Sequence, residues 1–141
     1  MSEDLYQAAI VAAARAGKAH GRLEAPNGSA TVDNPLCGDR VTIDVALAGE
    51  VVEAVGQLVR GCLLCEAAGA LIADAAPGQA PAALREVRPA LAAMLEHDAP
   101  PPGGAWRELE CFVPVRPYKS RHECVLLAFE ALEKALEAAA R

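Results

Sequence analysis

Three cysteines and one aspartate lie where segments of regular structure are expected to begin: Cys37, Asp39, Cys62 and Cys124. The first two flank one glycine in a turn before a strand, whereas the other two open helices. A helix N-terminus favours the thiolate over the thiol, and a thiolate serves both as a metal ligand and as a sulfur nucleophile. Three thiolates and one carboxylate would satisfy a tetrahedral zinc or iron site. The pattern alone leaves open that some of these are ordinary buried cysteines, since free cysteine is among the most buried residue types.

Two further cysteines and the histidines carry weaker signals. Cys65 forms Cys-Leu-Leu-Cys with Cys62, and positions i and i+3 of a helix share a face. This spacing permits a dithiol redox pair, an additional metal ligand or a second sulfur-carrying thiol, and it is equally compatible with a residue that only fills space. Cys111, in a short amphipathic stretch, is expected to be structural. The histidines are expected to be solvated or core residues rather than ligands: His20, His97 and His122.

Length and charge limit the class of protein. The 141-residue chain fits one domain, residues 1–141, and is long enough to fold without metal or disulfides. A net charge of −6 without a run of Lys and Arg argues against nucleic-acid binding. No apolar run approaches the roughly 18 residues of a membrane span, and the acidic N-terminus is unlike a secretory signal. We therefore expect a cytoplasmic protein whose five reduced thiols serve metal or sulfur chemistry.

The elements that must position these residues can be read from periodicity and from Gly and Pro punctuation. Residues 41–47 alternate apolar and polar side chains, and a turn at Ala48-Gly49 leads to a returning strand. The other expected elements are a helix over residues 2–17 capped by Ser2, a short strand over 30–32, and helices over 62–75, 81–96, about 106–113 and 120–139. This order predicts an α+β fold, with helices packed on one face of a small antiparallel three-stranded sheet.

Beyond these patterns, the sequence resembles a known family. Residues 30–47, which contain Asn-Pro-Leu-Cys-Gly-Asp-Arg, resemble the N-terminal motif of iron–sulfur scaffold proteins of the IscU/NifU family, and this form of the motif is similar to the SufU branch. The resemblance continues at Gly61-Cys62 and again at Arg121-x-x-Cys124-x-Leu-Leu-Ala-Phe. It therefore covers most of the chain, in the same order.

The resemblance implies an IscU-like fold and a site made of three cysteines and an aspartate, which by position are Cys37, Asp39, Cys62 and Cys124. Such proteins accept persulfide sulfur from a cysteine desulfurase. Scaffold members then build a 2Fe–2S cluster for apo iron–sulfur proteins, whereas SufU-like members bind zinc, with Cys37 as the expected sulfur acceptor. The resemblance favours a scaffold or sulfur acceptor over a free-standing enzyme, although a zinc-dependent sulfurtransferase remains open.

Three departures from the family pattern refine this hypothesis. Glu123 stands where IscU proteins have a histidine before the last cysteine, and their Leu-Pro-Pro-Val-Lys chaperone segment is absent; both points favour the SufU branch. Cys65 stands where the family usually has serine or another small residue. Two alternatives therefore stay open: a thiol–disulfide protein that uses Cys62-x-x-Cys65, and an interaction protein with a structural zinc.

Overall fold

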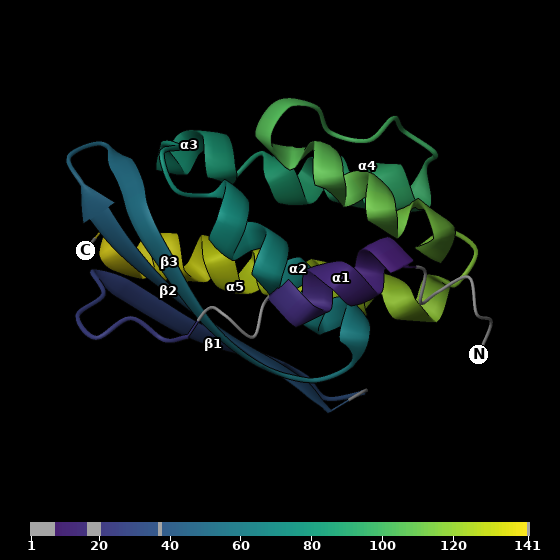
Figure 1. Ribbon diagram of the computed structural model, residues 1–141, viewed down its shortest axis with the longest axis horizontal. Helices are drawn as coiled ribbons and strands as arrows, with labels where there is room; N and C mark the ends of the chain where they lie inside the picture. Colours follow the sequence, from purple (N-terminus) through teal and green to yellow (C-terminus); the bar gives the residue numbers. More distant parts are fainter. Residues whose placement is uncertain (1–7, 17–20, 37, 141) are drawn as a thin grey trace.

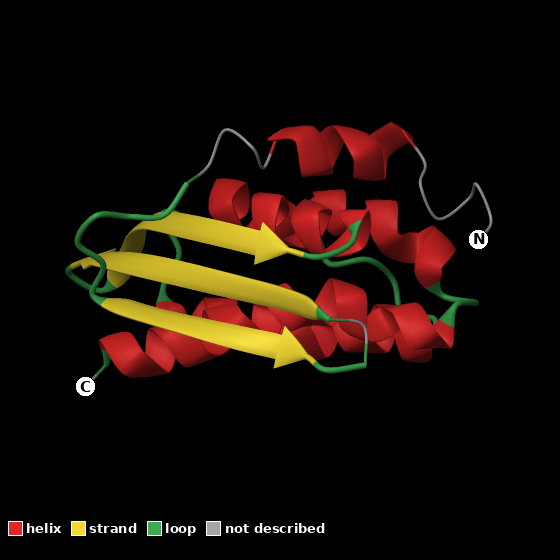
Figure 2. Cartoon of the chain, turned by 90° about the horizontal axis from the view of Figure 1, so that it is seen from below, coloured by secondary structure: helices red, strands yellow, loops and turns green. Residues whose placement is uncertain are grey.

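Three antiparallel strands, in the order β1-β2-β3, form the frame of the molecule: β1 (Gly28–Asn34), β2 (Asp39–Ala48) and β3 (Val51–Arg60). The computed structural model describes residues 8–16, 21–36 and 38–140. A tight turn joins β2 to β3, and Gly49 in this turn has a φ of +63°, a conformation that glycine adopts without steric cost. Figure 2 shows the strands side by side with helices behind them.

The register of the sheet decides which side chains face the helices. Val41, Ile43 and Val45 of β2 are fully buried on the inner face. Two helices cover this face: α2 (Leu63–Ala75) packs against β3, and α5 (His122–Ala139) packs against β1 and β2 (Figure 1). A Cβ on Gly28 would collide with the main chain of α5 at Ala135, so the glycine lets the last helix lie directly on the edge strand.

The remaining helices form an outer layer over α2 and α5. Helix α1 (Ala8–Ala16) packs on α2, while α4 (Val87–Glu96) and the 3-10 helix η3 (Gly104–Val115) pack against each other and against α5 and α2 respectively. Trp106 of η3 meets Phe129 of α5 edge to face, with 5.7 Å between the ring centroids. Short turns complete the chain, namely α3 (Pro81–Leu84) and the 3-10 turn η4 (Lys119–Arg121).

The predicted α+β fold, with a three-stranded antiparallel sheet and helices on one face, is confirmed. The single helix expected over residues 81–96 is wrong, because the chain forms α3 and α4 instead. Pro89 explains the break: it has no N–H for an interior helix bond, but it is tolerated in the first turn of a new helix. The strand expected over 30–32 is longer, since all of β1 pairs with β2. Within this ladder, the hydroxyls of Thr31 and Thr42 lie 2.8 Å apart. The Ser2 cap lies outside the described residues.

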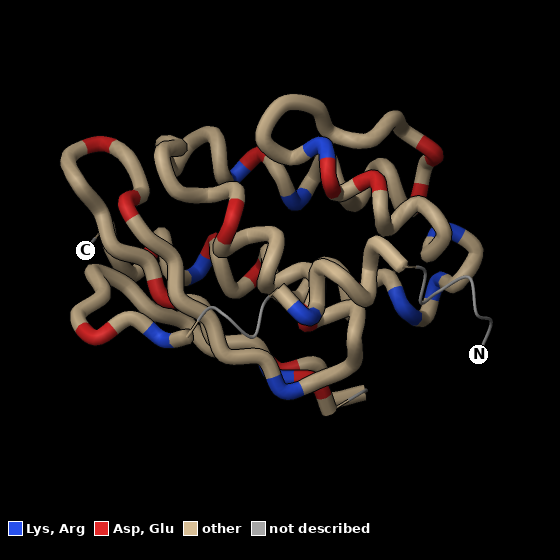
Figure 3. Tube along the Cα trace, in the orientation of Figure 1, with Lys and Arg blue, Asp and Glu red and all other residues tan. Residues whose placement is uncertain are grey.

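Charged residues do not gather on one element. Acidic and basic positions are interspersed over the trace (Figure 3), and Glu130 and Lys134 on α5 form an ion pair at 3.8 Å. Within the described ranges, no helix combines the length and apolar character that a membrane span requires.

Candidate metal centre

Three donor atoms meet at the end of the sheet where β2 begins. One oxygen of Asp39 and the sulfurs of Cys62 and Cys124 all lie within 4.8 Å of one another. Asp39 is the first residue of β2, Cys62 is the N-cap of α2, and Cys124 is the third residue of α5. Because both helices begin here, their positive dipole ends favour anionic sulfur at this point.

Asp39 is buried, with only 4% of its surface exposed, and its two oxygens differ. Its Oδ1 accepts a hydrogen bond from the main-chain N–H of Cys62 at 3.1 Å. Its Oδ2 is buried and has no hydrogen-bond partner among the described residues. A buried carboxylate oxygen without a partner is costly, and a cation is its natural partner. The donor set therefore fits a zinc or iron ion.

Gly61 makes this arrangement possible. A Cβ at position 61 would lie 2.6 Å from Asp39 Oδ1, closer than real Cβ atoms approach an oxygen. The absence of a side chain thus lets the aspartate lie directly under the start of α2, where it can reach the Cys62 amide. The Gly61-Cys62 pair recognised in the sequence has a steric reason.

A hydrogen bond between their side chains couples the pKa values of Cys62 and Cys124. The pKa of Cys62 is lowered, chiefly because the thiol of Cys124, and then that of Cys65, donates a hydrogen bond to its sulfur, which outweighs burial. The pKa of Cys124 is raised, chiefly by the same bond to Cys62. Arg121 Nη1 lies 3.8 Å from the Cys124 sulfur and favours its anionic form. The opposite directions of these two shifts favour the thiolate at Cys62 over the thiolate at Cys124.

Cys65 lies next to this cluster but is not one of its three members. Its side chain is fully buried, and its thiol donates to the main-chain oxygen of Cys124 at 2.9 Å. Hydrogen bonds with Cys124 and Cys62, followed by burial, raise the pKa of Cys65. Both causes favour the thiol over the thiolate at Cys65.

Cys37 lies outside the described residues, so the structure brings together three of the four predicted ligands and does not describe the fourth. Its neighbours show the kind of turn that precedes Asp39. The N–H of Gly38 donates to the main-chain oxygen of Asn34 at 2.8 Å, and Gly38 has a φ of +73°. Leu36 is 94% exposed on the same turn.

Other residues singled out in the sequence lie away from the cluster. The Nε2 of the buried His122 is 3.0 Å from the main-chain oxygen of Arg116, which makes it a core residue. Arg116 itself donates to the main-chain oxygen of Met94 in α4 and to that of Ala99, which follows α4. Cys111 is half-buried, and burial raises its pKa to about 12. His97 is exposed, as expected, and His20 lies outside the described part of the chain.

Arg121 is a site residue to which the sequence analysis assigned no role. Its guanidinium contacts the Cys124 sulfur. The available signal was its spacing, three residues before a cysteine at a helix start, which brings a cation onto the same face as the thiol.

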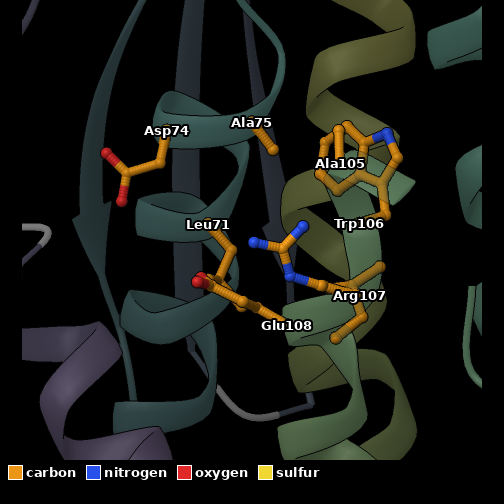
Figure 4. A pocket seen from close by; sticks show the side chains of 8 residues that line it. Leu71, Asp74, Ala75, Ala105, Trp106, Arg107 and Glu108 are labelled. Carbon is orange, nitrogen blue, oxygen red and sulfur yellow. The ribbon is translucent and has the colours of Figure 1, made fainter. Parts of the chain in front are cut away.

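A separate cavity of about 260 Å³ lies between α2 and η3. In Figure 4, the side chains of Arg107 and Glu108 reach from η3 toward α2, where Leu71 and Asp74 line the opposite wall. None of its lining residues belongs to the sulfur cluster, and none carries a thiol. The cavity therefore has no part in the candidate metal centre.

Comparison with known proteins agrees with this geometry. The structure of the N-terminal part of a NifU-like protein from Brucella abortus is 32% identical, covers 98% of this chain and 96% of that one, and superimposes with a TM-score of 0.91. The iron–sulfur cluster assembly scaffold protein IscU of Streptococcus pyogenes serotype M1 is 24% identical over 136 residues, which span 96% of this chain and 85% of that protein. No family model matches the chain.

A further solved structure has the same fold. It is described as an iron–sulfur cluster assembly scaffold protein for the SUF system from Fervidobacterium islandicum AW-1, with 24% identity, coverage of 96% and 99%, and a TM-score of 0.86. Fold and site together define a small α+β protein with thiols and a carboxylate gathered where two helices begin. The chain belongs to the IscU/NifU-like family of iron–sulfur cluster scaffold proteins.

Proposed function

We propose that this protein of iron–sulfur cluster assembly accepts sulfur from a cysteine desulfurase at a centre formed by Cys37, Asp39, Cys62 and Cys124. One observation carries the proposal: three of these residues place donor atoms within 4.8 Å of one another, and one Asp39 oxygen is buried without a partner among the described residues. A purely structural aspartate at this position would have both oxygens hydrogen-bonded.

The sulfur-transfer step uses Cys37 as the acceptor. Its thiolate attacks the outer sulfur of a persulfide on the desulfurase, a new S–S bond forms, and the old S–S bond breaks. The desulfurase cysteine leaves as a thiolate, and Cys37 carries the persulfide.

Asp39, Cys62 and Cys124 would hold the ion or cluster. A bound zinc keeps thiolates deprotonated at neutral pH, and a cluster would be the cargo passed to apo iron–sulfur proteins. The ligand set supports the zinc-binding SufU branch, because Glu123 replaces the family histidine and His122 is occupied by the main chain of Arg116. We place the protein in the cytoplasm, as a sulfur acceptor or scaffold rather than a free-standing enzyme.

The thiol–disulfide alternative would need Cys65 to react with an external partner. Its sulfur is fully buried and its proton is donated to a main-chain oxygen, so the geometry disfavours this role. An interaction protein with a structural zinc is distinguished by stability, since chelation would then unfold the chain.

The test measures metal content, visible absorption and sulfur release in the presence of a cysteine desulfurase and cysteine. Cys37→Ala, Cys62→Ala and Cys124→Ala should each lose metal binding by at least about a hundredfold, while the matched variant Cys111→Ala binds like the wild type. Zinc with stimulated sulfur release supports the SufU-like role, and absorption that builds on adding iron supports the scaffold role. Full metal binding in all three cysteine variants would sink the proposal, as would unfolding on chelation.

A further inference from the structure

Cys65 is a third thiol at the edge of a cluster that consists of two cysteines and one aspartate, and the contacts around it indicate its role there. It lies one helical turn after Cys62 on α2, and its sulfur contacts the first turn of α5 at Cys124. The two contacting residues are 59 positions apart in the sequence. The contact therefore joins the two helix starts that carry the candidate ligands.

The hydrogen bond across this contact has a fixed direction. A main-chain oxygen can only accept, so the thiol of Cys65 is the donor in the 2.9 Å bond to Cys124. A carbonyl oxygen has two lone pairs, so it accepts the thiol without giving up its place in the α5 helix. This bond joins a side chain of α2 to the main chain of α5.

The position of Cys65 sets it apart from the candidate ligands, since it stands outside the trio of donors that lie within 4.8 Å of one another. It is also fully buried and belongs to the hydrophobic core.

We propose that Cys65 is a positioning residue of the metal centre: its thiol donates to the Cys124 carbonyl and holds the first turns of α2 and α5 at the separation at which Cys62 and Cys124 share one ion. This inference rests on the proposed metal-binding function. It assigns Cys65 to neither the ligand set nor a redox pair, and it gives the cysteine at this position a role that a small apolar residue cannot fill.

The test compares two substitutions of Cys65 in the full chain by cobalt and zinc binding. Cys65→Ser keeps a donor, whereas Cys65→Val places an apolar side chain without a donor at the same position. Cobalt is the probe because its thiolate charge-transfer absorption scales with the number of sulfur ligands. Zinc affinity is measured by competition with a chelator, and thermal unfolding of the metal-free variants reports folding. Cys111→Val is the matched control for replacing a half-buried thiol outside the centre.

We expect Cys65→Ser to bind one cobalt per chain with wild-type charge-transfer intensity and with an affinity within about threefold of the wild type. We expect Cys65→Val to bind with unchanged intensity but about tenfold more weakly, as typical for loss of an outer-shell partner. Cys111→Val should match the wild type. A merely structural role would lower the unfolding temperature of Cys65→Val without this selective loss of affinity.

Two outcomes would overturn the inference alone: a charge-transfer band reduced by one thiolate in Cys65→Ser, which would make Cys65 a ligand, or wild-type affinity in Cys65→Val, which would make it a space filler. If Cys65→Val does not fold, the band intensity of Cys65→Ser still decides between ligand and positioning residue. Failure of the wild-type chain to bind cobalt or zinc would instead overturn the proposed function, and the inference with it.

Discussion

Strand β2 carries two buried carboxylates five residues apart, and their surroundings are opposite. Asp44, on the outer face of the sheet, accepts four hydrogen bonds: two from Arg22, at 2.8 and 2.9 Å, one from Ser29 at 2.6 Å and one from the Leu23 N–H at 3.1 Å. Asp39, at the end of the strand, accepts one from Cys62, and its second oxygen is left without a partner among the described residues.

The contrast separates a structural carboxylate from a functional one. Every lone-pair direction that Asp44 offers is filled by the protein itself, so the protein gains stability from it and no other group can bind. Asp39 is held in place by one bond and keeps an oxygen available beside two sulfurs. In a buried setting, incomplete hydrogen bonding leaves an oxygen that can bind a ligand, as it does for Asp39.

The largest expected effect is the loss of stability in Asp44→Asn. The amide has one acceptor oxygen instead of two, and its NH2 group would face the donors of Arg22. We expect the free energy of unfolding to fall by about 2–3 kcal/mol in urea titrations, with metal stoichiometry unchanged.

The matched control for this variant is Asp33→Asn. The carboxylate of Asp33 is 52% exposed and pairs with Arg40 on the surface, so its loss should leave stability nearly unchanged. An Asp44→Asn protein as stable as Asp33→Asn would contradict the structural reading of Asp44.

Asp39→Asn should show the reverse pattern. Removing the charge from the candidate ligand should weaken zinc binding about thirtyfold, which corresponds to about 2 kcal/mol, in competition with a chelator. The metal-free chain should be as stable as the wild type or more so, because a buried, unpaired charge has been removed. Loss of stability without loss of metal affinity would show that the two carboxylates do not differ as described.

Acid should remove part of the Asp44 contribution, a smaller effect than its substitution. The hydrogen bond from Arg22 holds the pKa of Asp44 below its usual value, against the opposing effect of burial. Its folded-state pKa is therefore lower than its unfolded-state pKa of about 3.9, so its stabilisation is complete above that value and is lost as the pH falls toward the lowered pKa.

Urea titrations of the metal-free wild type and of Asp44→Asn between pH 6 and pH 2.5 measure this dependence. The stability difference between the two proteins should be constant above about pH 5 and should shrink below about pH 4. A difference that grows on acidification would contradict the assigned sign.

The smallest expected effect is that of Gly61→Ala. The new Cβ would push Asp39 away from the Cys62 amide, because it would lie 2.6 Å from Oδ1. We expect zinc affinity to fall about fivefold, or about 1 kcal/mol. Gly103→Ala is the matched control, since a Cβ there meets nothing within 4 Å. Equal affinities in the two variants would show that Asp39 can move without consequence.

The sequence was sufficient to locate the candidate metal centre because its residues lie near the starts of strands and helices, which local sequence patterns reveal. Glycine before Cys62 and a helical stripe after Cys124 mark those boundaries, and both helix starts were predicted within two residues. The family resemblance then supplied the grouping of Cys37, Asp39, Cys62 and Cys124, which no spacing rule could give.

Long-range contacts account for what the sequence did not reveal. Alternation in β2 placed Asp44 on a solvent-facing side, yet it is buried, because Arg22 and Leu23 lie over the outer face of the sheet. Gly56 permits that approach, since a Cβ there would lie 2.6 Å from the Leu23 nitrogen. The role of Cys65 likewise depends on a carbonyl 59 residues away.

The sequence separations of 23 positions from Asp39 to Cys62, and of 59 from Cys65 to Cys124, have a thermodynamic consequence. Donors so far apart come together only when the sheet and both helices are in place, so the unfolded chain offers no equivalent set. An ion that binds only the folded chain stabilises it by mass action, by about 2.7 kcal/mol at a free concentration one hundred times the dissociation constant. Loading and unloading of the centre should therefore shift the melting temperature of the entire chain.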